Sequence, residues 1–359
     1  MKTRILTNWK FWLGITLSGT FMVIAFWKVD FPKLWEALLH INFFWLVVGV
    51  FTYYINLAIR AIRWGYIFRP VKKVGFWGMY GATIFGYFAN NILPVRLGEV
   101  ARAIYIGLKE GVDKSASLGT IAVERIFDVL SALVLLAIVF YSFPFPEEVV
   151  GEWGGYFRQA GGGLLVLSAF GLGFLFFMVI QKERALGMVE FFLRLAPEKL
   201  RGSMRDLARS FIDGLSILGN PYHVLVIVLL SAVIWLTSLL PVYFSGIAFN
   251  KPEFIFSFSD CLLLLVAGAI AAAIPASPGF VGTFHAGQIM AVLVILSAKA
   301  GPGMSRAEWI DWAAAFAIIV HALYLLTTTI TGLFILAASG IKFRQISGAE
   351  KQTTEGEKK

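Results

Sequence analysis

Long uncharged runs of apolar residues dominate the chain and set its fold class. A membrane-spanning helix needs about 20 mostly apolar residues, because the hydrocarbon layer is roughly 30 Å thick. Backbone groups cannot stay unpaired in lipid, and no alternating barrel pattern is present, so the runs predict helices. Six stretches qualify, near 9–27, 43–61, 119–142, 161–181, 222–246 and 310–338. The pattern predicts an all-α, polytopic helical membrane protein with six long spans.

Two further apolar stretches are interrupted at mid-length. The first, about 75–107, is broken after Asn90, and the second, about 257–298, is broken from Pro275 onward. Proline removes a backbone donor and glycine permits a sharp reversal, so each break should divide its helix. The two breaks are also weakly alike, at 93–100 and 274–281. The expected break residues are Asn90, Pro94, Gly98, Pro275, Pro278, Gly279 and Gly282.

The distribution of charge decides how the broken stretches sit in the membrane. Lys and Arg gather after the second span at 60–73, after the fourth at 182–209, and in the C-terminal tail, whereas the connection at 143–160 is acidic. If both broken stretches enter and leave on one side, every basic connection and both termini are cytoplasmic. A single crossing would turn the stretch at 182–209 outward. We therefore expect two re-entrant hairpins of opposite orientation, an inverted repeat, in a multi-pass protein of the cell (plasma or inner) membrane.

One membrane domain accounts for most of the chain. We expect residues 1–346 to form an integral membrane, transporter-like domain and residues 347–359 to be a disordered cytoplasmic tail. Within the domain, about residues 183–219, apolar residues recur at helical spacing among arginines. This spacing predicts an amphipathic segment, either on the anionic inner surface of the membrane or packed on the protein's own cytoplasmic face.

Composition narrows the classes of function. The net charge of +9 is carried between apolar runs, with no recognition helix or zinc-finger pattern, so membrane lipids and not nucleic acid are the expected partners. A single cysteine excludes an intramolecular disulfide, and four scattered histidines show no metal-ligand spacing. No metal or other cofactor is expected. Walker, zinc-protease and hydrolase-elbow motifs are missing, which favours a transporter over an enzyme and nominates no catalytic residue. The oligomeric state is open.

Ionisable residues at membrane depth are costly, so they mark functional positions or structural ion pairs. Arginine binds phosphate through forked donors, and a helix that begins after Pro94 offers free N–H groups to an anion. The candidate substrate-binding residues are Arg96, Arg102, Arg125, Glu99, Glu124, Asp128 and Asn91. The alternative is a structural ion-pair network, in which Glu99 pairs with Arg96 or Arg102.

Three polar residues beside the breaks have two interpretations each. The amides of Asn90 and Asn91 can cap backbone groups freed by the break, or contact a ligand. His285 follows the second break and is a possible proton carrier, because the pKa of histidine lies near neutrality. The alternative for His285 is a structural hydrogen-bond donor.

These motifs, in their order along the chain, resemble one known family. They are Asn90-Asn91-Ile92-Leu93-Pro94-Val95-Arg96-Leu97-Gly98-Glu99, then Arg102, then Glu124-Arg125-x-x-Asp128, then Pro275-x-x-Pro278-Gly279-x-x-Gly282. Over nearly its whole length the chain resembles the lysylphosphatidylglycerol synthase transmembrane-region (flippase-like) family, whose members stand alone or are fused to a cytoplasmic aminoacyltransferase. The resemblance implies movement of lipids between leaflets. It does not imply lysyl transfer, because no aminoacyltransferase domain is present. Many members carry a glutamate where this chain has Phe284-His285, so a mechanism that needs that carboxylate is not implied.

The expected function is that of a lipid flippase or transporter. An anionic phospholipid or lipid-linked headgroup would pass between leaflets through a polar groove between the opposed hairpins. Two alternatives remain open. One is a membrane-embedded enzyme that modifies a lipid or glycolipid headgroup, with Glu99, Glu124 or Asp128 as general base or metal ligand. The other is a membrane scaffold that transports nothing.

Overall fold

The computed structural model describes residues 16, 19–24, 26–27, 29–93, 97–146, 151, 154–181, 184, 187, 202, 215–274, 278–299 and 306–340. Every regular element within these ranges is a helix, as the apolar pattern predicts. The α-helices are α3 Phe31–Leu39, α4 Phe43–Ile67, α5 Phe76–Ile92, α6 Gly98–Glu110, α7 Lys114–Ser142, α9 Gly154–Ile180, α12 Pro221–Ile247, α13 Phe258–Ala273, α14 Thr283–Lys299 and α15 Arg306–Ser339. Three short 3₁₀ turns join them: η3 Leu215–Gly219, η4 Pro252–Phe254 and η5 Pro278–Phe280.

Four described segments are long and apolar enough to cross a membrane: Phe43–Ile67, Pro221–Ile247, Pro278–Lys299 and Trp309–Ser339. Three of them coincide with predicted spans, near 43–61, 222–246 and 310–338. Pro278–Lys299 was expected as half of a re-entrant stretch, yet it reaches spanning length because η5 leads directly into α14. The protein is therefore a polytopic membrane protein with several apolar helices.

The remaining predicted spans differ in how much of them is described. Those near 119–142 and 161–181 fall on α7 and α9, which the structure extends to 29 and 27 residues. The span near 9–27 lies mostly outside the described residues. Of the amphipathic segment at 183–219 only residues 184, 187, 202 and 215–219 are described, and the tail at 347–359 lies outside them.

Helix α4 corrects one sequence-based assignment. It runs on to Ile67, so Arg60 and Arg63 lie within the helix and not in the connection after it. The Arg63 side chain is fully buried, at 0% exposure. A buried guanidinium needs charged or polar partners, and here they come from other helices, which the local sequence does not reveal.

Helices α5 and α6 form an antiparallel pair around the first break. Phe85 of α5 stacks on Tyr105 of α6 with ring centroids 4.9 Å apart. Nearer the break, the Asn90 Oδ1 atom accepts a hydrogen bond of 2.7 Å from the Gly98 backbone N–H. The helices are so close that a Cβ atom on Gly98 would lie 2.3 Å from the Gly86 carbonyl oxygen. The first broken stretch is thus a helical hairpin.

Helices α13 and α14 form a second antiparallel pair. The Gln288 Nε2 atom of α14 donates to the Leu264 carbonyl of α13 at 2.9 Å. At the break, Gly279 and Gly282 have φ values of +70° and +92°, in the left-handed region that glycine adopts without steric cost. Both glycines were expected there on the basis of the broken apolar pattern.

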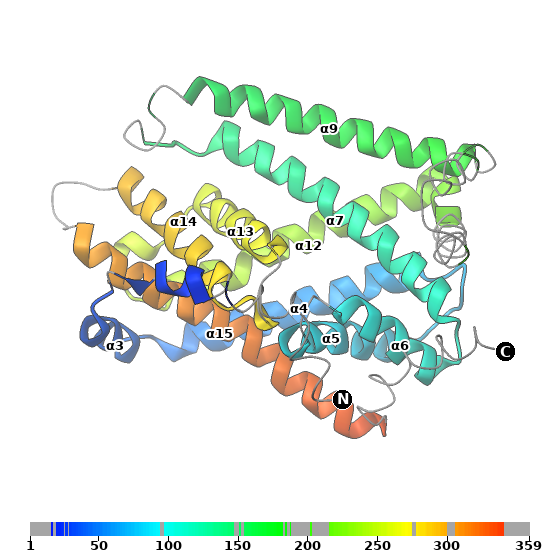
Figure 1. Ribbon diagram of the computed structural model, residues 1–359, viewed down its shortest axis with the longest axis horizontal. Coiled ribbons are helices and arrows are strands. Elements are labelled where there is room, and N and C mark those ends of the chain that lie inside the picture. Colours follow the sequence, from blue (N-terminus) through cyan, green and yellow to red (C-terminus); the bar gives the residue numbers. More distant parts are fainter. Residues whose placement is uncertain are drawn as a thin grey trace.

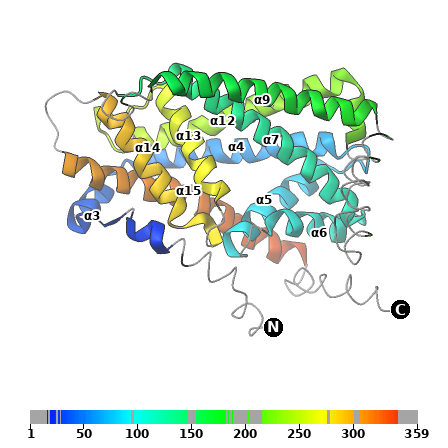
Figure 2. The ribbon, with the colours of Figure 1, turned by 45° about the horizontal axis from the view of Figure 1, so that its top comes forward.

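The two hairpins approach each other from opposite ends of the molecule. In Figures 1 and 2, α13 and α14 lie toward the left end of the long helices, and α5 and α6 lie toward the right end. Their ends meet beside α15. A Cβ atom on Gly279 would lie 2.9 Å from Leu325 of α15 and 3.7 Å from the Asn91 carbonyl oxygen of α5.

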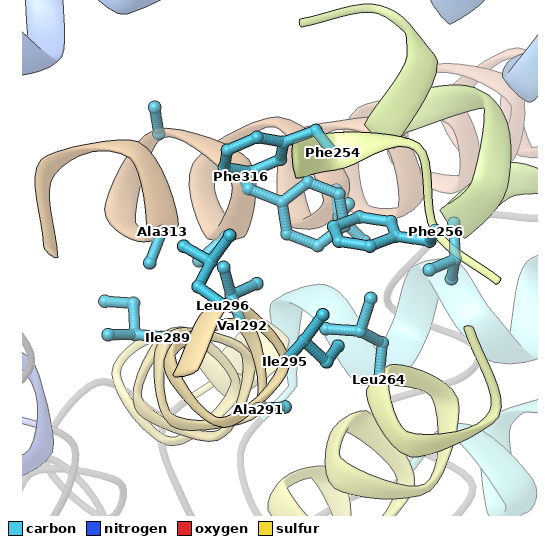
Figure 3. Close-up of a cluster of buried hydrophobic side chains, with 14 of the residues drawn as sticks. Phe254, Phe256, Leu264, Ile289, Ala291, Val292, Ile295, Leu296, Ala313 and Phe316 are labelled. Carbon is cyan, nitrogen blue, oxygen red and sulfur yellow. The ribbon is translucent and has the colours of Figure 1, made fainter. Parts of the chain in front are cut away.

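The largest hydrophobic cluster fixes α13, α14 and α15 relative to one another. Figure 3 shows Phe254 and Phe256, from the segment before α13, beside Phe316 of α15. Val292 and Ile295 of α14 face them and are fully buried. This packing holds the α13–α14 hairpin against α15, the helix that also contacts α5 of the other hairpin.

Candidate functional site

A buried carboxylate, Glu124 of α7, is the centre of the ion-pair cluster. Its side chain is 1% exposed. The Arg102 Nη2 atom of α6 lies 3.1 Å from Glu124 Oε2, and Arg125 Nη2 lies 2.7 Å from Glu124 Oε1. Arg63 Nη2 of α4 lies 3.6 Å from Oε1. Three guanidinium groups from three helices thus surround one carboxylate.

A second carboxylate completes the cluster. Asp128 follows Glu124 by one helical turn, so both face the same side of α7. Its Oδ1 atom lies 2.6 Å from Arg63 Nη2, and its Oδ2 atom lies 3.1 Å from Arg125 Nη2. Three arginines against two carboxylates leave the cluster with one net positive charge. Such an excess attracts an anion and costs free energy if nothing neutralises it.

Two of the arginines are held by the protein itself. The Arg102 guanidinium lies over the Trp64 ring at 3.6 Å and donates to Thr83 Oγ1 at 3.1 Å. Arg63 Nη1 donates to Ser231 Oγ of α12 at 2.9 Å. Both side chains are buried, and their bonds connect α4, α6, α7 and α12.

Arg125 differs from the other two. Its side chain is 38% exposed, and both of its ion pairs use the single nitrogen Nη2. The Nε atom is buried without a partner, so Nη1 is the nitrogen that remains available for a ligand. Arg125 is the member of the cluster best placed to meet a ligand.

The predicted partner of Arg102 is different in the structure. In the alternative interpretation Glu99 pairs with Arg96 or Arg102; in the structure Arg102 pairs with Glu124, and Arg96 lies outside the described residues. Glu99 is half-buried and interacts electrostatically with Arg125. The helical spacing allowed the Glu99–Arg102 pair, and the packing of α6 against α7 brought a more deeply buried carboxylate to the same arginine.

Two arginines of α4 were missed by sequence reasoning: Arg63, which is part of the cluster, and Arg60, which lies near it. Arg60 interacts electrostatically with Asp128 and Arg125 and lies one turn before Arg63 on α4. Tyr53, Asn56, Arg60 and Arg63 recur at intervals of three and four residues, so one face of α4 carries a polar stripe. That spacing was a usable signal, but the two arginines were counted as charges of a connection.

The asparagines at the first break serve the hairpin. Asn90 accepts the Gly98 N–H, as described above. The Asn91 amide donates to Thr328 Oγ1 at 2.9 Å and Thr329 Oγ1 at 3.0 Å, and so ties the end of α5 to α15. Asn91 was expected to contact the substrate. In the structure its amide has a structural role, because it bonds to α15.

His285 belongs to a closed chain of hydrogen bonds. The Gly279 carbonyl can only accept, so His321 Nε2, 2.7 Å away, carries the hydrogen. His321 Nδ1 then accepts from His285 Nε2 at 3.3 Å, and His285 Nδ1 faces the Gly282 N–H at 3.4 Å. Both imidazoles are thereby neutral and engaged at each nitrogen. These bonds give His285 a structural use at the second break, and its role as a proton carrier stays a prediction.

Some predicted residues lie outside the described ranges, namely Arg96, Pro94 and Pro275. Pro278 is described and opens η5. Within the described ranges no group of three His, Cys, Asp or Glu side chains is arranged to hold a metal ion. The two carboxylates of the cluster are already occupied by arginines, which suits anion binding better than cation binding.

Comparisons with known proteins agree on the family. A family model described as the lysylphosphatidylglycerol synthase TM region matches residues 11–332. A UPF0104 membrane protein of Methanocaldococcus jannaschii is 26% identical over 240 residues, which cover 65% of this chain and 85% of that protein. A protein of Haloferax volcanii named glycosyltransferase AglD is 29% identical over 90 residues, only 14% of its length. No solved structure matches significantly. The chain belongs to the lysylphosphatidylglycerol synthase transmembrane-region family.

Proposed function

We propose that this protein moves an anionic lipid between the leaflets of a cell membrane, with both termini in the cytoplasm. The observation that carries the proposal is the buried ion-pair cluster with one net positive charge and one partly exposed arginine, Arg125. Buried charge in a membrane protein is retained mainly where it serves an ion or substrate path. A phosphate group supplies the missing negative charge and fits the forked donors of arginine.

The depth of the cluster supports a path and not a surface contact. Glu124 lies ten residues from the first residue of α7, which at 1.5 Å per residue is about 15 Å along the helix. We place the start of α7 at the membrane surface, and because the hydrocarbon layer is about 30 Å thick, the cluster then lies about halfway across it. In this placement a headgroup that reaches Arg125 has left its own leaflet surface.

The arrangement of the hairpins supports alternating access. We propose that α5–α6 is re-entrant from the cytoplasm and that α13–α14, from Phe258 to Lys299, enters from the opposite side. The proposal draws on their positions at opposite ends of the long helices (Figure 2) and on the basic residues that the sequence places near α5 and α6. Opposed broken helices around a midplane site are typical of inverted-repeat transporters.

Reconstitution with a labelled lipid tests the proposal. Liposomes that contain the purified protein should expose fluorescent phosphatidylglycerol to an impermeant quencher faster than empty liposomes do. Arg125→Gln should reduce the added rate by about tenfold or more, because a charge-assisted hydrogen bond to the phosphate is worth about 1.5–3 kcal/mol. The fold should persist, since Glu124 keeps Arg102 and Asp128 keeps Arg63.

The matched control is Arg69→Gln, which removes an exposed arginine that follows α4. It should transport at the wild-type rate. Equal quenching with wild-type and empty liposomes, at several lipid compositions, would reject lipid transport.

A second function, a membrane enzyme that modifies a lipid or glycolipid headgroup, is suggested by the names of the family and of one similar protein. The family description contains the word synthase, and the matched Haloferax volcanii protein is named a glycosyltransferase. In that case incubation of the protein with membrane lipids and activated sugars should yield a new lipid by mass spectrometry. Glu124 and Asp128, both bound by arginines, are poor general bases, so transport is the better supported of the two.

A further inference from the structure

We propose that Arg60, with Tyr53, Tyr87 and Tyr324, forms a headgroup subsite for a membrane lipid whose phosphodiester headgroup carries hydroxyl groups. The inference rests on the proposed lipid transport and deepens it by naming the chemical class of the headgroup. The four residues come from α4, α5 and α15 and were not among the sequence-predicted site residues.

The orientation of Arg60 is fixed before any ligand arrives. Its Nε atom donates to Asn56 Oδ1 at 2.9 Å. The Asn56 amide nitrogen is in turn held by α12, at 2.7 Å from the Ile234 carbonyl and 2.9 Å from Thr237 Oγ1. These bonds assign the asparagine oxygen to Arg60 and leave the far edge of the guanidinium, Nη1 and Nη2, outside this network. A donor positioned in advance loses less entropy on binding.

The far edge of Arg60 has no protein partner among the described residues. Its Nη1 and Nη2 atoms form no ion pair or hydrogen bond with the described residues. Neither atom is among the polar atoms that are buried from solvent without a partner. By contrast, Arg63 and Arg102 are engaged at both terminal nitrogens. A guanidinium inside a membrane helix is stable only beside water or an anion. Arg60 is therefore available for a phosphate.

Three tyrosines extend the subsite from Arg60. Tyr53 and Tyr87 interact electrostatically with Arg60, and the Tyr53 ring lies against Tyr324 with centroids 4.8 Å apart. None of the three hydroxyl groups has a hydrogen-bond partner among the described residues or is sealed from solvent. Tyr54, next to Tyr53, shows the opposite case, because its hydroxyl bonds to Thr331 Oγ1 at 2.6 Å.

The spacing of these residues indicates more than a phosphate. Tyr53 precedes Arg60 by seven residues, about 10 Å along α4. Because Tyr53 packs against Tyr324 about two turns away from Arg60 on α4, a ligand that engages all three carries polar groups beyond its phosphate. A headgroup with several hydroxyl groups both donates to and accepts from tyrosine hydroxyls and spans that distance. Sugar-like or polyol headgroups fit, and bare phosphodiesters leave the tyrosines unused.

Lipid binding in detergent micelles, measured by native mass spectrometry on the full chain, tests the subsite directly. The probes are phosphatidylinositol and phosphatidylethanol, which share one phosphodiester charge and differ in headgroup hydroxyls. Wild-type protein should bind phosphatidylinositol more tightly. Arg60→Gln should weaken the binding of both lipids by about tenfold, because the phosphate donor is lost. Arg69→Gln, on a non-buried arginine of the same segment, should change neither.

Variants of the three tyrosines distinguish recognition of the headgroup hydroxyls from recognition of the phosphate charge. The triple change Tyr53→Phe, Tyr87→Phe and Tyr324→Phe keeps the rings and should weaken phosphatidylinositol binding about fivefold while phosphatidylethanol changes less than about twofold. Tyr222→Phe, on an exposed tyrosine, is the control. Unfolding midpoints of all variants should match the wild type.

Several outcomes would overturn the subsite: no binding of either lipid, wild-type affinity in Arg60→Gln, or equal loss of both lipids in the triple variant. Displacement of the lipid by micromolar inositol 1-phosphate would overturn the membrane source of the ligand. Transport measured in parallel separates the two proposals. If Arg60→Gln loses binding and wild-type protein translocates nothing, the subsite stands and transport fails. If transport is unaffected by Arg60→Gln, the subsite fails alone.

Discussion

At the residue scale, burial separates structural arginines from candidate ligand arginines. Arg102, Arg125, Glu124 and Asp128 were nominated from sequence, and the structure brings all four together. Arg60 and Arg63 were not nominated, because the apolar run weakens before them and helix length is uncertain at its ends. Which carboxylate pairs with Arg102 depends on the packing of α6 against α7, and helical spacing alone does not reveal it.

The central carboxylate should matter for stability more than for binding. Glu124→Gln leaves Arg63, Arg102 and Arg125 with Asp128 as the one carboxylate of the cluster. Breaking a buried ion pair costs about 3–5 kcal/mol, so the unfolding midpoint in detergent should fall by many degrees. Glu110→Gln removes a partly exposed pair with Lys72 and should cost at most about 1 kcal/mol. Similar midpoints for the two variants would show that the cluster is solvated and not structural.

At the element scale, the broken apolar pattern located both helical hairpins. Proline and glycine at the breaks have local effects on the backbone, so they can be recognised without tertiary information. The length of α4 and the continuity of η5 with α14 depend on packing against other helices, and there the sequence-based boundaries were short.

Close contact between α5 and α6 makes Gly98 the sensitive position of the first hairpin. A Cβ atom there would lie 2.3 Å from the Gly86 carbonyl oxygen and 2.4 Å from Asn90 Oδ1, so Gly98→Ala must push the helices apart. Overpacking costs typically about 1–3 kcal/mol, and the Asn90 bond would be lost as well. Thermal unfolding in detergent should detect the loss. Gly75→Ala has open space around it and serves as the control; equal midpoints for the two variants would mean that the hairpin yields without cost.

At the scale of the whole molecule, the proposed topology assigns each connection to one side of the membrane. The positive-inside rule assigns that side from charge, and re-entrance places both ends of the α5–α6 hairpin on one side. Hydropathy cannot decide this, because a hairpin and a single crossing have the same composition.

Labelling of single cysteines with an impermeant maleimide decides it. In a Cys261→Ser background, Lys73→Cys and Lys109→Cys should react from the same, cytoplasmic side, and Lys33→Cys from the other. All three lysines are exposed, and the native Cys261 is buried. Reaction of positions 73 and 109 from opposite sides would show that this stretch crosses the membrane once.

The two hairpin ends share one support. Within α15, His321 holds the Gly279 carbonyl and Thr328 holds the Asn91 amide, with about two helical turns between them. A shift or tilt of α15 therefore acts on both ends at the same time and in a fixed ratio. Independent opening of the two faces would require breaking one of these attachments. In the proposed transporter, the movements of the two hairpins would therefore be coupled through α15.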